Sequence, residues 1–121
     1  MRGIIDRLAK NKDGTLEIHD YKTSRRLPSP DQIADDVQLT LYEIAIRQRW
    51  PETGNVSLIW HYLAFDKEIK ITKTAQQLET VKQNALELIQ RIEATHLFPV
   101  NVTPLCDWCE YKEICPAMRK A

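Results

Sequence analysis

The dipeptide Asp13-Gly14 constrains the fold of this chain more than any other local feature. It separates two stretches, residues 2–10 and 15–24, that read as β-strands. Asp-Gly between two such stretches is a strong signal for a β-hairpin. The chain is therefore expected to contain an antiparallel pair of strands close to its first residue.

The hairpin register fixes which side chains face each other. A three-residue loop with the glycine in the left-handed conformation places residue 11 opposite residue 15. The same register places Asp6 directly opposite Asp20. Because side chains alternate along a strand, Lys22 is expected on the same face as Asp20.

This arrangement predicts a metal site. Opposed residues have Cβ atoms about 4.5–5.5 Å apart, so the carboxylates of Asp6 and Asp20 would repel each other unless a cation lay between them. Oxygen ligands favour Mg²⁺ or Mn²⁺. The alternative is a surface salt bridge to Lys22, which would contribute little. A register slip of one residue would also separate these side chains.

A helix is expected after the hairpin. Residues 29–32, Ser-Pro-Asp-Gln, form a capping box with proline at the first helical position, and the helix should continue to about Trp50, before Pro51. Gln38 and Tyr42 are four residues apart and share a face. Both can donate hydrogen bonds to phosphates or bases; alternatively they are a surface glutamine beside a half-buried tyrosine.

The rest of the chain supplies further elements of an α/β fold. Residues 56–66 are rich in β-branched and aromatic residues and read as a strand, with 67–72 as its short partner. A second capping box at 74–77 opens a helix to about Thr95. A loop over 96–105 leads to the cysteines.

The three cysteines follow a metal-binding spacing. Cys106-x2-Cys109 can chelate one metal, and Cys115 is within reach. Soft thiolates favour zinc or an iron–sulfur cluster. A structural zinc needs four ligands, so a histidine would have to complete it; the candidates are His19, His61 and His96. The alternative is three free thiols.

Three of these motifs together resemble a known family. Gly3-Ile-Ile-Asp6-Arg7, then Asp20-Tyr21-Lys22 and then Gln38-x3-Tyr42 closely resemble the RecB-like branch of the PD-(D/E)XK nuclease superfamily. The trailing cysteines are similar to those of its iron–sulfur subgroup, which includes AddB-type helicase–nuclease subunits and CRISPR-associated RecB-like exonucleases. The resemblance extends from residue 3 to about 116.

The resemblance implies a restriction-endonuclease-like core, with a small mixed β-sheet flanked by helices. The helix that precedes the first strand in relatives is not found, so we expect a chain that is truncated at its N-terminus. The partial nuclease core would occupy residues 1–98 and the cysteine segment residues 99–121.

The resemblance also implies roles for individual residues. Asp6, Asp20 and the main-chain carbonyl of Tyr21 would bind Mg²⁺ or Mn²⁺. Lys22 would orient or deprotonate the attacking water. Gln38 and Tyr42 would support the site or contact DNA. Two departures from the family concern the metals. Ala9 stands where many relatives carry a second acidic residue, and the fourth cysteine of a 4Fe–4S cluster would lie upstream. The resemblance therefore implies activity and a cluster for the full-length protein, whereas this chain alone is expected to be inactive, poorly metallated or dependent on another copy or chain.

The expected function is therefore hydrolysis of DNA phosphodiester bonds, as an exonuclease or end-processing enzyme in repair or recombination. A helicase subunit or a second copy of the chain would be its partner. Two alternatives remain open: an inactive DNA-binding module and a zinc-binding interaction domain. The formal net charge is zero, so any DNA binding must use local clusters. Without a signal peptide or an apolar span, a cytoplasmic location is expected, with no membrane partner.

Overall fold

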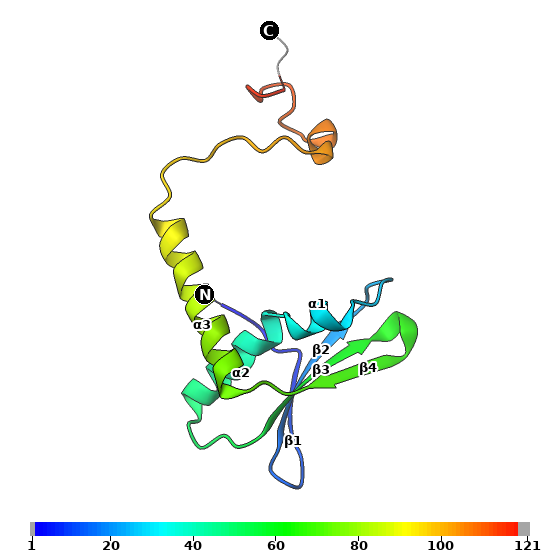
Figure 1. Ribbon diagram of the computed structural model, residues 1–121. Coiled ribbons are helices and arrows are strands. Elements are labelled where there is room, and N and C mark those ends of the chain that lie inside the picture. The colour runs from blue at the N-terminus through cyan, green and yellow to red at the C-terminus, as the bar shows by residue number, and fades with distance from the viewer. Residues whose placement is uncertain (1, 119–121) are drawn as a thin grey trace. The chain divides into compact units, whose positions relative to one another are not determined.

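The computed structural model describes residues 2–118 and divides into two compact units. The first unit is Met1–Leu88 and the second is Ile89–Ala121, so the division falls within one long helix. Figure 1 shows the sheet and two helices of the first unit, and the segment that leads to the last residues. The two units are described separately.

The first unit is built on a four-stranded mixed sheet, as the sequence predicts. Its strands are β1 (Arg7–Lys10), β2 (Leu16–Lys22), β3 (Val56–Tyr62) and β4 (Lys67–Ile71). They lie in the order β1-β2-β3-β4 (Figure 1). The outer pairs are antiparallel and the central pair, β2 with β3, is parallel.

The predicted hairpin register is confirmed. Residue Arg7 pairs with His19, the Asn11 N–H donates to the Thr15 carbonyl at 2.9 Å, and Gly14 has φ +88°. However, the first strand begins at residue 7 and not at residue 2. The ladder ends there because the Tyr21 N–H donates to the carboxylate of Asp6, at 3.0 Å, where a continued strand would offer a main-chain carbonyl.

The predicted single helix from residue 30 to Trp50 is wrong, because the structure has two helices there. They are α1 (Pro30–Ala34), which has the predicted capping box, and α2 (Gln38–Arg49). The N-cap of α2 is Val37, which makes no side-chain capping bond; the carboxylate of the preceding Asp36 accepts the Leu39 N–H at 3.1 Å and so stabilises the first turn of the new helix.

The later elements are shorter than predicted. Strand β3 ends at Tyr62, because residues Leu63–Phe65 form a 3₁₀ turn, η1, and Asp66 adopts the left-handed conformation with φ 46°. Helix α3 (Ala75–Glu93) opens with the predicted capping box of Thr74 and Gln77.

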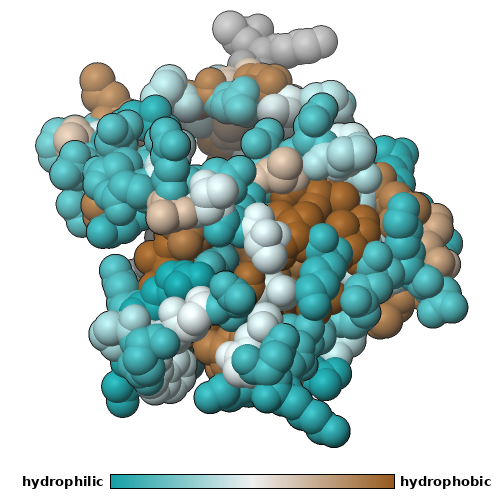
Figure 2. Space-filling view, turned by 60° about the horizontal axis from the view of Figure 1, so that its bottom comes forward, coloured by the Kyte–Doolittle hydropathy of each residue, from teal (hydrophilic) through white to brown (hydrophobic). Residues whose placement is uncertain are grey.

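The core lies between one face of the sheet and the two shorter helices. Ile18, Leu58 and Trp60 come from the strands and are at most 1% exposed. Leu39 and Ile46 of α2 and Ile33 of α1 pack against them. On the face seen in Figure 2, brown apolar surface remains visible between hydrophilic side chains. The side of the sheet that bears Ile18, Leu58 and Trp60 also carries the candidate site.

The second unit continues from the end of α3. Its regular element is a 3₁₀ helix, η2 (Pro104–Trp108), followed by turns up to residue 118. None of the helices between residues 2 and 118 combines the length and the apolar character that a membrane crossing needs.

Candidate active site

The centre of the site is an ion pair between Asp20 and Lys22 on strand β2. They are two residues apart, so both side chains are on the face that carries Ile18. Asp20 is only 5% exposed. The Lys22 Nζ lies 2.7 Å from its Oδ2. A carboxylate on such a buried surface needs this kind of compensation, because removing a charge from water is costly.

Helix α2 completes this centre with the two residues that the sequence singled out. The Lys22 Nζ donates to the Gln38 Oε1 at 3.0 Å, and the Gln38 Nε2 donates to the Asp20 Oδ1 at 3.3 Å. The same Nε2 lies 3.4 Å from the Tyr42 hydroxyl. One amide therefore bridges both members of the ion pair, and fixes the helix relative to the strand.

Asp6 lies at the start of the hairpin, opposite Asp20 when the strand register is extended by one residue. Its side chain is exposed, and its Oδ2 accepts the main-chain N–H of Tyr21 at 3.0 Å. This bond ties Asp6 to the segment between Asp20 and Lys22. The structure thus brings together the six residues that the sequence named for the site within the first unit, and the Tyr21 group seen in contact is its main-chain N–H.

Electrostatics keeps Lys22 charged. Burial alone would lower its pKa, but the hydrogen bond and charge of Asp20, assisted by Asp36, raise the pKa above its ordinary value. Tyr62, the β3 partner of Lys22 in the parallel register, is 7% exposed, and burial raises the pKa of its phenol.

Asp36, Tyr62 and Gly3 belong to this environment although the sequence did not assign them a role in it. Gly3 packs so closely on Tyr42 that an added Cβ would lie 2.5 Å from the ring Cε1. The capping preference of Asp36 was the only local signal available, since the other two contacts join segments that are far apart in sequence.

The donor atoms fit a hard divalent cation. Asp6, Asp20 and the Tyr21 carbonyl offer oxygen only, which Mg²⁺ and Mn²⁺ prefer. The Asp20 Oδ2 is buried, and its neighbour is the Lys22 ammonium at 2.7 Å. Among residues 2–118, no three His, Cys, Asp or Glu side chains form a group that could hold a metal. The remaining ligands would therefore have to be main-chain oxygen and water, as is common for Mg²⁺.

The opposite face of the sheet carries a histidine pair. The His19 Nδ1 and the His61 Nε2 are 2.8 Å apart, and the Tyr21 ring stacks on His61 with centroids 4.8 Å apart. Burial, followed by the charges of Arg7 and His61, lowers the pKa of His19. The Tyr21 ring is thus held by His61 on the face opposite the candidate site, while the main-chain N–H of Tyr21 donates to Asp6 of that site.

The cysteines lie in the second unit. All three are free thiols; Cys109 is exposed, and Cys106 and Cys115 are partly buried. The Thr103 N–H donates to the Cys106 sulfur at 3.3 Å. Within the described part of the chain these thiols do not form a metal-binding group, with each other or with a histidine.

Comparison with known proteins agrees with the geometry. The family model described as the PD-(D/E)XK nuclease superfamily matches residues 1–116. No curated protein matches the chain significantly. The mixed four-stranded sheet with flanking helices is consistent with the restriction-endonuclease-like fold. The chain belongs to the PD-(D/E)XK nuclease superfamily.

Proposed function

We propose that this chain hydrolyses phosphodiester bonds of DNA with Mg²⁺ or Mn²⁺, as an exonuclease or end-processing nuclease in repair or recombination. Membership of a nuclease superfamily supports the reaction class. The choice of DNA, the mode of attack and the cellular role are our inference from the RecB-like motifs. A cytoplasmic location, where thiols stay reduced, would suit the free cysteines.

One observation carries the proposal: a buried carboxylate and an ammonium group are held together on one strand by an amide from a neighbouring helix. Asp20 and Lys22 are 2.7 Å apart, and Gln38 contacts both. Asp20 is buried and both of its oxygens are engaged, Oδ1 by Gln38 and Oδ2 by Lys22, so the strand and the helix hold the carboxylate and the ammonium in a fixed arrangement.

The residues would divide the chemistry as follows. Asp6, Asp20 and the Tyr21 carbonyl would hold the metal ion. When bound, that ion would activate water and stabilise oxyanion charge. The Lys22 ammonium would orient the attacking water and offset the charge that develops on the phosphoryl oxygens.

Gln38 and Tyr42 would position this machinery and contact the substrate. The Gln38 amide holds Lys22 through its oxygen and Asp20 through its nitrogen, so both groups keep a fixed orientation. The Tyr42 hydroxyl accepts from the Gln38 amide at 3.4 Å, and its own proton would be donated to a phosphate oxygen of the substrate.

We also propose that Cys106, Cys109 and Cys115 bind a 4Fe–4S cluster, with zinc as the alternative, once a fourth ligand is available. The spacing of the thiols supports this. Anaerobic purification should give a brown protein that absorbs visible light, and Cys109→Ser should lose the colour. A colourless protein loaded with zinc would contradict the cluster and support the alternative.

A helicase subunit or a second copy of the chain is the proposed partner.

The nuclease is tested with Mn²⁺-dependent degradation of labelled single- and double-stranded DNA. Lys22→Ala should lower the rate by about 10²–10⁴-fold, the range typical when a positioned proton-transfer or charged group is lost. Lys12→Ala is the matched control, because it removes a lysine from the exposed hairpin loop. Equal rates for wild type and Lys22→Ala would refute this mechanism, and DNA binding without degradation would favour an inactive binding module.

A further inference from the structure

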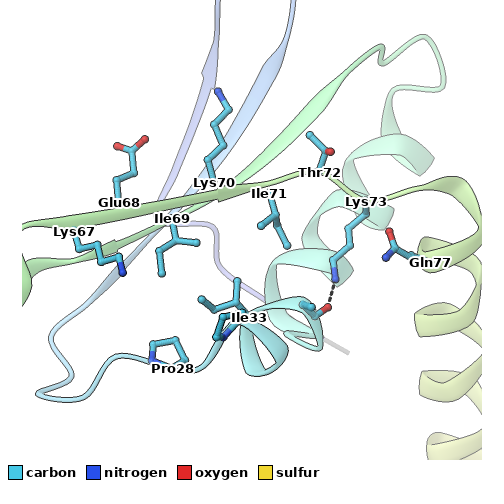
Figure 3. Close-up of a pocket in the computed structure, with 12 residues that line it drawn as sticks. Pro28, Ile33, Lys67, Glu68, Ile69, Lys70, Ile71, Thr72, Lys73 and Gln77 are labelled. Carbon is cyan, nitrogen blue, oxygen red and sulfur yellow. Dashed lines mark hydrogen bonds between the residues drawn. The ribbon is translucent and has the colours of Figure 1, made fainter.

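A groove outside the candidate active site has no role in the mechanism above. It lies between β4, α1 and the start of α3, within the first unit, and has a volume of about 610 Å³. Figure 3 shows Ile69 and Ile71 of β4 pointing toward Ile33 of α1 across it. The floor is therefore aliphatic, and Pro28 and Pro30 extend it.

Lysines lie at both ends of this floor. Lys67 is at one end and Lys73 at the other, while Glu68 and Lys70 project to the opposite side of β4 (Figure 3). The Lys73 Nζ donates to the Ala34 carbonyl, so that lysine is held in place by α1. No carboxylate projects from β4 on the groove side, and an anionic ligand would meet positive charge there.

The groove continues the row of side chains that contains Lys22. Lys22 pairs with Tyr62 across β2 and β3, and Tyr62 pairs with Lys67 across β3 and β4. Paired residues project to the same face of a sheet, so all three lie on the face of the active site. Adjacent strands are about 4.8 Å apart, which places the main chains of Lys22 and Lys67 about 10 Å apart.

We infer that this groove holds the strand of nucleic acid that leads to or from the scissile bond. The inference rests on the proposed nuclease function and specifies where its substrate lies. A stacked strand carries one negative charge about every 3.4 Å, so a few nucleotides would span the distance from Lys22 to Lys67. Bases would cover the isoleucine floor, and a phosphate would lie beside the Lys67 ammonium.

Charge complementarity decides between occupants. An apolar peptide would fill the floor but would gain nothing from a free ammonium group at its end. Lys67 makes no ion pair within the described residues, and its side chain is exposed. A strand of nucleic acid would cover the isoleucine floor with its bases and bring a phosphate to Lys67. Contacts of Lys and Arg with phosphates supply most of the non-specific affinity for nucleic acid.

The test measures binding of a fluorescent single-stranded 12-mer without divalent metal, at several salt concentrations. Lys67→Ala should weaken binding about 3- to 10-fold and reduce the slope of log K against log salt by about 0.7, the value for one phosphate contact on a single strand. The matched control Lys12→Ala should leave both quantities unchanged. If Lys67→Ala binds the 12-mer like wild type, the groove is not the substrate path.

Cleavage separates this inference from the proposed function. With Mn²⁺, Lys67→Ala should raise KM for the 12-mer and leave the turnover of a dinucleotide unchanged, because a dinucleotide cannot reach the groove. If wild type cleaves nothing but Lys67→Ala still weakens 12-mer binding, the nuclease proposal fails and the groove stands as a nucleic-acid site. If the wild type cleaves the 12-mer and Lys67→Ala has the same KM as the wild type and as Lys12→Ala, the groove inference fails and the nuclease proposal stands.

Discussion

At the residue scale, the two oxygens of Asp20 have different surroundings. Oδ1 accepts a hydrogen bond from the neutral amide of Gln38 at 3.3 Å, whereas Oδ2 is buried and lies 2.7 Å from the Lys22 ammonium. A metal ion bound at Oδ2 would take over the charge compensation that Lys22 provides, while Gln38 would still fix the side chain through Oδ1. The identities of these residues are visible in the sequence, but the partner of each oxygen depends on packing and is not.

Gly3 is predicted to hold Tyr42 in position. In Gly3→Ala the new Cβ would meet the Tyr42 ring at 2.5 Å, so the ring must move and its hydroxyl would leave Gln38. We expect a loss of about 1–3 kcal/mol of stability, as for other overpacked sites. Urea unfolding measures this loss. In a Tyr42→Leu background, Gly3→Ala should lose less stability than it does in the wild type. Equal losses from Gly3→Ala in the two backgrounds would contradict the contact.

Glu43 is predicted to cost stability at neutral pH. It is 0% exposed, and burial raises its pKa above the ordinary 4.5, although the paired Arg47 lowers the pKa in part. Because the folded state keeps this proton to higher pH than the unfolded state, the contribution of Glu43 to stability falls as pH rises above 4.5. Glu43→Gln should remove this slope and be as stable as wild type, or more so, at pH 7.

The corresponding substitution of the residue that pairs with Glu43 is Arg47→Ala. It would leave the buried carboxylate uncompensated and remove the hydrogen bond to the Thr53 carbonyl. We expect a loss of about 2–4 kcal/mol, since breaking a buried pair is far more costly than neutralising it. Denaturant unfolding across pH 4.5–8 makes both measurements. A larger loss for Glu43→Gln than for Arg47→Ala would contradict this account.

At the element scale, local signals identified the turns and caps and missed a boundary. The hairpin register and the capping boxes at Ser29 and Thr74 depend on neighbouring residues, and they are confirmed. The break between α1 and α2 was missed because the helical spacing of apolar residues continues across it. The hydrogen bond from the Leu39 N–H to the Asp36 carboxylate nevertheless begins a separate helix there, and Gln38 becomes the first residue of α2.

Asp36 is therefore predicted to stabilise the first turn of α2 from the position before its N-cap, and so to place Gln38. Asp36→Ala should lose about 1 kcal/mol, the usual cost of removing an N-terminal cap. It should also lower nuclease activity, because Gln38 would no longer be fixed beside Asp20. Asp35→Ala is the control, as its side chain makes no hydrogen bond within the part of the chain described. Thermal unfolding that finds Asp35→Ala as damaging as Asp36→Ala would refute the cap.

At the scale of the whole molecule, the sheet order could not be derived from one sequence. The parallel pairing of β2 with β3 joins segments separated by two helices, and no local pattern specifies it. A mixed sheet was expected from the family resemblance alone. The sequence placed Asp6 opposite Asp20, but it could not show that Tyr62 and Lys67 extend the same row across the sheet.

The central claim is that Asp6, directly before β1, and Asp20 on β2 share one divalent cation beside Lys22. Electron paramagnetic resonance titration of Mn²⁺ tests it most directly, because it needs no substrate. The account predicts about one tightly bound Mn²⁺ per wild-type chain, a loss of affinity of at least about tenfold in Asp6→Asn and Asp20→Asn, and retained binding in Lys22→Ala. Unchanged Mn²⁺ affinity in both aspartate variants would contradict it.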